Sequence, residues 1–143
     1  MKKIILFLLM INQPLKAQIS NFGVELGYKY RYTNNAIFGL SYKLEENHYG
    51  TLRLPDWTNL NIAYITDFND EHYVVAGITK TFILLEIGLY ASTQKDIEPI
   101  LGFNLGNIAR INFGYNIAFK QKNNFTFGVS FALGRSKYYI AGF

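Results

Sequence analysis

Apolar and polar residues alternate along most of the chain. In FGVELGYKYRY, Phe22–Tyr32, apolar side chains occupy every second position, and glycine, glutamate, lysine and arginine stand between them. Strict alternation is typical of a β-strand whose two faces meet different surroundings. No segment after the N-terminal residues sustains the period of about 3.6 residues that an amphipathic helix requires. The sequence therefore predicts an all-β protein.

The alternating segments predict a closed antiparallel sheet in which consecutive strands pair. Nine strands are clear, at residues 22–32, 36–44, 59–66, 72–78, 82–92, 100–107, 111–119, 125–134 and 137–143. A short tenth, Tyr49–Leu54, precedes Pro55. A closed barrel with both ends of the chain on one side needs an even number of strands. We therefore expect an antiparallel up-and-down β-barrel of 8–10 strands and favour ten.

The composition of the two faces indicates which one meets lipid. The polar face is rich in Gly, Asn, Ser and Ala rather than in the Lys, Glu and Thr of a water-facing strand. Glycine weakens a solvated strand, whereas small residues leave needed room inside a narrow barrel. The other face carries apolar rows in residues 111–119 and 125–134, each about 9 residues long, which is enough for a tilted strand to cross a bilayer. Tyr28, Tyr30 and Tyr32 gather near a strand end, a position that suits the headgroup level. These features predict a transmembrane β-barrel.

The first residues, MKKIILFLLMINQPLKAQ, resemble a secretory signal peptide. Two lysines precede a short apolar run, Pro14 breaks it, and Ala17 offers a small residue for cleavage. The run is shorter than the about 20 residues that a transmembrane helix needs. We expect residues 1–17 to be removed and residues 18–143 to form a single barrel domain.

Removal of this segment changes the charge of the protein. Three of the 14 Lys and Arg residues leave with it, so 11 basic residues remain against 10 acidic ones. No basic stripe is left to bind nucleic acid. The chain has no cysteine, which excludes a disulfide framework and a lipid-modified N-terminal cysteine.

Several charged residues fall on the face that is expected to line the barrel. They are Glu25, Lys29, Arg31, Lys43 and Glu86. A barrel of eight to ten strands is filled mostly by side chains. We therefore expect this lumen charge cluster to plug the barrel and fix the strand register, in preference to lining a small selective pore.

The alternating strands, the signal peptide and the terminal Phe143 together resemble the small outer-membrane β-barrels of the OmpX, OmpA-transmembrane-domain and OmpW type. In that class a C-terminal aromatic residue is read by the barrel-assembly machinery. Phe143, Ala141 and Tyr139 fit this assembly signal, whereas Lys137 stands where an apolar residue is expected. The resemblance implies a location in the outer membrane, contact with its lipid, and the assembly machinery as a partner during biogenesis.

The sequence offers little catalytic chemistry. His48 and His72 lie in no nucleophile motif, and neither has the serine two residues away that outer-membrane lipid A deacylases carry. The acidic residues of 67–71 lack the spacing of a calcium loop and suit a solvated turn better. Gly102–Gly106 has no following lysine, so it is not a phosphate loop. We expect no enzymatic activity, no metal and no cofactor.

Three readings of the function remain. The leading one is a non-enzymatic outer-membrane barrel with a structural, surface-binding or narrow-channel role. The alternative is a secreted, soluble, lipocalin-like β-barrel that binds an apolar ligand in its core. The third is a membrane enzyme that acts on lipids, with a serine or histidine pair at the barrel rim. The sequence does not name the small-molecule ligand of any of them.

Overall fold

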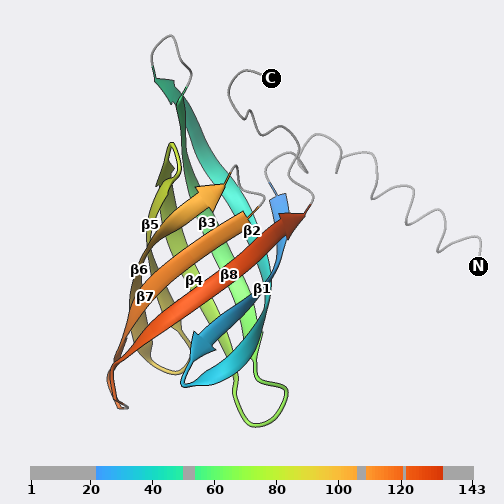
Figure 1. Cartoon of the computed structure of the whole chain (residues 1–143), viewed down its shortest axis with the longest axis vertical. Coiled ribbons are helices and arrows are strands. Elements are labelled where there is room, and N and C mark those ends of the chain that lie inside the picture. The colour runs from blue at the N-terminus through green and yellow to red at the C-terminus, as the bar shows by residue number, and fades with distance from the viewer. Residues whose placement is uncertain (1–21, 50–53, 106–108, 121, 134–143) are drawn as a thin grey trace, which may run out of the picture.

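The computed structural model describes residues 22–49, 54–105, 109–120 and 122–133. In it, eight strands form a closed antiparallel barrel (Figure 1). They are β1 (Phe22–Arg31), β2 (Thr33–Tyr49), β3 (Leu54–Thr66), β4 (His72–Phe82), β5 (Leu85–Ser92), β6 (Asp96–Leu105), β7 (Ala109–Ala118) and β8 (Asn124–Leu133). None of the described residues forms a helix that is long and apolar enough to cross a membrane.

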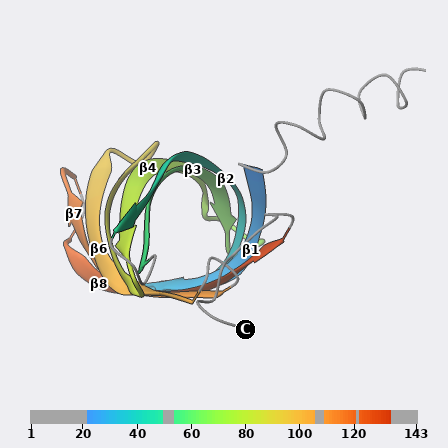
Figure 2. The same ribbon diagram turned by 90° about the horizontal axis from the view of Figure 1, so that it is seen from above.

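Pairing between the first and last strands closes the barrel. Each strand pairs with the next along the chain, and β8 pairs with β1 from Val24 opposite Leu133 to Tyr30 opposite Phe127. Seen from above, the ribbon forms a ring (Figure 2). A closed sheet leaves no strand edge in the ring. The all-β class and the antiparallel up-and-down barrel predicted from the alternation are confirmed.

The ring contains eight strands, so the favoured count of ten was wrong and the lower count holds. Tyr49 and Leu54, the ends of the expected tenth strand, instead pair with each other as the ends of β2 and β3. The expected strand at residues 137–143 lies outside the described residues. The ring needs neither segment, because β8 is already hydrogen-bonded to β1.

The two ends of the barrel differ. At the turn end, the lower end in Figure 1, lie the connections β1–β2, β3–β4, β5–β6 and β7–β8. At the hairpin end, β1 begins, β8 ends, and the long β2–β3 hairpin extends beyond the neighbouring strands. The β2 strand extends past Tyr42, where its pairing with β1 ends, and its register with β3 shifts between Lys43 and Glu45. Tight connections place Tyr32, Phe68, Ile83 and Lys95 at positive φ.

The alternation in the sequence becomes two contrasting faces. Every strand presents large apolar side chains outward, as at Val24, Leu40, Ile62, Ile78, Ile87, Leu101, Phe113 and Phe131. The buried residues that face inward are mostly polar or charged. The distribution is the reverse of that in a water-soluble barrel, where the apolar side chains fill the interior.

Candidate functional site

A network of ion pairs crosses the barrel interior, and Arg110 lies at its centre. This side chain comes from β7 and is only 2% exposed. Its guanidinium Nη1 donates to Glu25 Oε2 on β1 at 3.0 Å, and its Nη2 donates to Glu86 Oε1 on β5 at 2.6 Å. Arg110 thus links β7 to β1 and β5 through charge-assisted hydrogen bonds, which are stronger than hydrogen bonds between neutral groups.

Neighbouring polar side chains complete the coordination of both carboxylates. Ser130 donates a hydrogen bond to Glu25. Asn104 Nδ2 and Thr81 Oγ1 donate to Glu86 Oε2 at 2.8 and 3.1 Å. A buried ion pair is tolerated only when its remaining donors and acceptors are satisfied. The hydrogen bonds from Ser130, Asn104 and Thr81 meet this requirement for the carboxylates of Glu25 and Glu86.

Two further ion pairs lie between Arg110 and the turn end. Lys29 Nζ on β1 lies 2.5 Å from Glu98 Oε2 on β6, and Thr126 donates to the same carboxylate. Arg31 Nη2 lies 2.5 Å from Asp96 Oδ2, again between β1 and β6. The ion pairs are therefore stacked along the barrel axis, because charged residues on one strand face inward at every second position.

Arg31 has a second, aromatic contact. Its guanidinium carbon lies 5.1 Å from the centre of the Tyr73 ring, within the range of a cation–π interaction. In the orientation that satisfies its neighbours, the Asn116 amide donates to Asp96 Oδ1 at 3.1 Å and accepts from Arg31 at 2.8 Å. Near the hairpin end, Lys80 forms an ion pair with Asp56. Both residues occupy outward positions of their strands, in line with Ile78 on β4 and Leu60 on β3, so this pair lies outside the lumen network.

One wall of the interior is apolar. The buried residues Ala63, Ile65, Tyr73 and Val75, from β3 and β4, form a small cluster against which Ile37 and Tyr90 pack. A cavity of about 40 Å³ separates this wall from Glu25 and Lys29. Such a volume holds a few water molecules at most.

The structure places four of the five predicted cluster residues together in this network. Glu25, Lys29, Arg31 and Glu86 are all buried and ion-paired. Lys43 is half-buried and lies opposite Asn59, a fully buried residue of the inner face. The assembly signal at Phe143 and Tyr139, like the signal peptide at residues 1–17, lies outside the described residues.

Sequence reasoning missed Arg110, Asp96 and Glu98, which hold the network together. Asp96 and Glu98 lie between the predicted strands at residues 82–92 and 100–107, and Arg110 lies just before the predicted strand at residues 111–119. A signal was present, because Asp96 and Glu98 share the parity of Gly102 on the inner face of β6. Arg110 likewise shares the parity of Asn112 on β7. Extending each strand by one or two alternations would have found all three.

The histidine and acidic residues of the β3–β4 loop serve the turn itself. His72 Nδ1 lies 2.8 Å from the hydroxyls of Tyr64 and Thr66, and its Nε2 lies 3.1 Å from the carbonyl of Asn69. The backbone N–H of Asn69 donates to Asp67 Oδ1 at 2.9 Å, which lowers the pKa of that carboxyl. Within the described ranges, no group of three or more His, Cys, Asp or Glu side chains is arranged to hold a metal.

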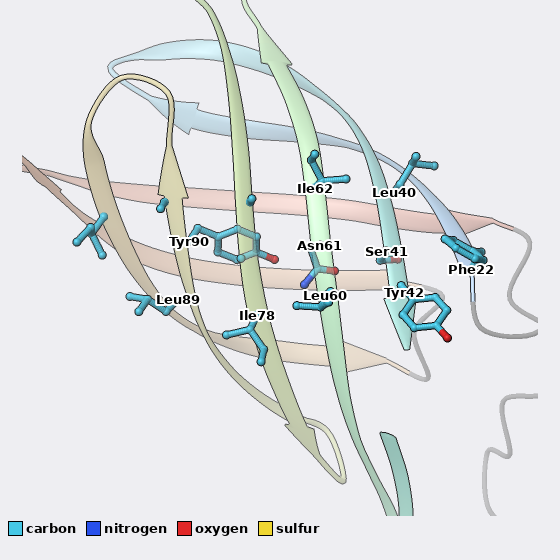
Figure 3. A pocket seen from close by; sticks show the side chains of 14 residues that line it. Phe22, Leu40, Ser41, Tyr42, Leu60, Asn61, Ile62, Ile78, Leu89 and Tyr90 are labelled. Atoms are coloured by element: carbon cyan, nitrogen blue, oxygen red, sulfur yellow. The ribbon is translucent and has the colours of Figure 1, made fainter. Parts of the chain in front are cut away.

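An apolar hollow lies on the outer face of the sheet. It has a volume of about 710 Å³, and Leu40, Leu60, Ile62, Ile78 and Leu89 surround it (Figure 3). Two small residues on neighbouring strands, Ala76 and Ala91, are paired in register and also line it. Their short side chains explain why the surface is recessed there.

Comparisons with known proteins found no family model, no curated protein and no solved structure that matches this chain. The resemblance to outer-membrane barrels therefore stays a prediction from the pattern of the sequence.

Proposed function

We propose that this protein is a small, non-enzymatic β-barrel that lies in the bacterial outer membrane, with a lumen closed by ion pairs. The observation that carries the proposal is the arrangement of its two faces: apolar side chains point outward on every strand, and ion pairs fill the inside. A structural or surface-binding role follows from such a barrel more directly than transport does.

The outer face supports contact with lipid. Burial of apolar surface is worth about 25 cal/mol per Å², and soluble monomers rarely expose continuous apolar patches beyond a few hundred Å². Here the apolar surface continues around all eight strands. In a bilayer this surface meets acyl chains, which also fill the hollow over Ala76 and Ala91.

The aromatic residues near the turn end support the same proposal. Tyr28, Tyr30, Tyr64 and Tyr115 project outward from β1, β3 and β7 as these strands approach or leave that end. Tyrosine is enriched where a membrane meets water, because its ring is apolar and its hydroxyl is polar. The ring of apolar surface thus ends in residues suited to the headgroup level.

The interior favours a membrane barrel over the soluble alternative. A lipocalin-like protein needs an apolar core with space for its ligand, and pockets for small molecules span roughly 300–1,000 Å³. The cavity between the apolar wall and the side chains of Glu25 and Lys29, in the described part of the barrel, is about 40 Å³. This cavity has room for water and no room for a lipid.

The same interior argues against an open pore. Ion pairs between β1 and β6, and between β7 and both β1 and β5, cross the lumen at three levels. Side chains fill the interior of most barrels of this size. A permanently open channel for solutes would require these pairs to separate.

Fractionation of cells that express the full chain tests the proposal. We expect the protein in the outer-membrane fraction, and we expect its gel mobility to change on boiling, because a closed barrel resists detergent until heated. The chain lacking residues 1–17 is the control and should stay out of that fraction. A soluble protein whose mobility does not change would overturn the proposal and favour the lipocalin-like alternative.

A further inference from the structure

Three lysines lie on two adjacent connections at the turn end. Lys95 is in the β5–β6 turn, and Lys120 and Lys122 are in the β7–β8 loop. The two connections touch, because the backbone N–H of Phe119 donates to the carbonyl of Lys95 at 3.3 Å. The hydroxyl of Tyr32 in turn donates to the carbonyl of Lys122. We call Lys95, Lys120 and Lys122 the lysine rim.

The charges of the lysine rim are available to a partner. All three side chains are exposed. None of them forms an ion pair with another residue in the part of the chain that the structure describes. The lysine rim therefore concentrates positive charge on one sector of the turn end.

Aromatic rings project beside the lysine rim. Phe119 is 70% exposed and Phe125 is 79% exposed, whereas Leu101 in the middle of β6 is 54% exposed. The Phe125 ring packs against Tyr115, with 5.0 Å between ring centres. Lysines next to exposed aromatic rings, just beyond an apolar surface, form the arrangement that suits the boundary between acyl chains and headgroups.

Asp96 follows Lys95 directly, but it is buried and paired with Arg31. The other acidic residues of this end in the described part of the chain lie on a different loop. Asp67, Asp70 and Glu71 belong to the β3–β4 loop, where Asp67 and Glu71 accept hydrogen bonds from neighbouring groups. Positive and negative charge are therefore divided between sectors of the turn end. Among the described residues, the positive sector combines lysines that form no ion pair with the exposed rings of Phe119 and Phe125, so it is the sector that an anionic lipid would prefer.

We propose that the lysine rim binds the phosphate groups of anionic lipids, while Phe119 and Phe125 rest among their acyl chains. The proposal depends on the membrane location proposed above. A lipid is favoured over an acidic protein segment because the rings and the lysines adjoin the lipid-facing surface directly. Each cation near an anionic membrane surface adds to the attraction, so the three lysines act together.

Native mass spectrometry of the purified full chain in detergent tests this proposal by titration with phosphatidylglycerol and, separately, with phosphatidylcholine. We expect a preference for phosphatidylglycerol that falls by roughly tenfold or more in the variant Lys95→Gln, Lys120→Gln, Lys122→Gln. The control variant Asp67→Asn, Asp70→Asn changes charge at the same end and should keep the preference. Inorganic phosphate should fail to compete at concentrations where the lipid binds.

Three results would overturn the proposal: equal binding of both lipids, full competition by inorganic phosphate, or self-association that the lysine variant abolishes. Insertion of the unmodified protein into pure phosphatidylcholine vesicles, followed by its change of gel mobility on heating, is measured in parallel. If the protein inserts but shows no lipid preference, the lysine rim proposal alone fails. If it does not insert, the membrane location fails first.

Discussion

At the scale of single residues, Arg110 is the group on which the interior depends most. It neutralises Glu25 and Glu86 together, so its loss leaves two carboxylates buried without a cation. Breaking a buried ion pair from one side costs about 3 to 5 kcal/mol. We expect Arg110→Met to lower the free energy of unfolding by that amount.

Trp57, the only tryptophan of the chain, provides the signal for this measurement, since it is buried inside the barrel. Unfolding by guanidinium chloride in lipid vesicles can be followed through its fluorescence. Asp70→Asn is the control, because it removes an exposed charge outside the network and the lysine rim, and it should change stability by less than about 0.5 kcal/mol. Equal stabilities for the two variants would contradict the role given to Arg110.

Two glycines make a second comparison at this scale. A Cβ atom at Gly102 would overlap the carbonyl oxygen of Ile111 and lie 2.8 Å from Asn112 Cα, both parts of the fixed backbone of β7. A Cβ atom at Gly39 would lie 3.2 Å from that of Ala63, which a small shift relieves. We expect Gly102→Ala to cost roughly 1–3 kcal/mol of unfolding free energy and Gly39→Ala clearly less. A reversed order in the same unfolding assay would contradict this packing.

The residues of the interior could be predicted in part. Glu25, Lys29 and Arg31 follow from simple parity within one long alternating strand. Asp96 and Glu98 did not, because Pro99 lies next to them and proline is normally excluded from the middle of a sheet. The structure accommodates it through a gap in the β6–β7 pairing between Ile97 and Ile100. The sequence of β6 alone gives the parity of both acidic residues, but it does not show the gap in pairing with β7 that lets the strand continue through Pro99.

At the scale of strands, the outward face of β6 distinguishes a membrane barrel from a soluble one. Leu101 lies near the middle of this strand and is 54% exposed. An arginine near the bilayer midplane costs about 2–4 kcal/mol in a membrane barrel, and one near the interface costs about 0–1 kcal/mol. We expect Leu101→Arg to lose the larger amount of unfolding free energy in vesicles, and Phe119→Arg at the turn end to lose the smaller.

A soluble barrel would respond differently to these substitutions. A charge on a water-exposed strand surface changes stability by about 0.5 kcal/mol or less. Nearly equal stabilities for Leu101→Arg and Phe119→Arg would therefore argue that the outer face meets water.

The strand positions were easier to predict than their number. Alternation located the middle of each strand in the ring, because it reflects the two environments directly. It could not show that Tyr49 and Leu54 end two long strands of one hairpin, since that depends on pairing between β2 and β3. Closure by β8 depends in turn on contacts more than 90 residues apart in the sequence.

At the scale of the whole molecule, the central claim is that the apolar outer face meets lipid while the charged inner face is sealed. The chain contains no cysteine, so single cysteines can be introduced without a background. Phe131 points outward on β8 and is 55% exposed, and the adjacent Ser130 is buried in the interior. Asp70, in the β3–β4 loop, provides a reference exposed to water.

The most direct measurement is the accessibility of a spin label at Phe131→Cys in vesicles, compared with a label at Asp70→Cys. Collisions with oxygen report a lipid environment, and collisions with a water-soluble nickel chelate report an aqueous one. Ser130→Cys should meanwhile react slowly with any thiol reagent. The account predicts that the Phe131→Cys label meets oxygen and excludes the chelate, whereas equal access of the chelate to both labels would contradict it.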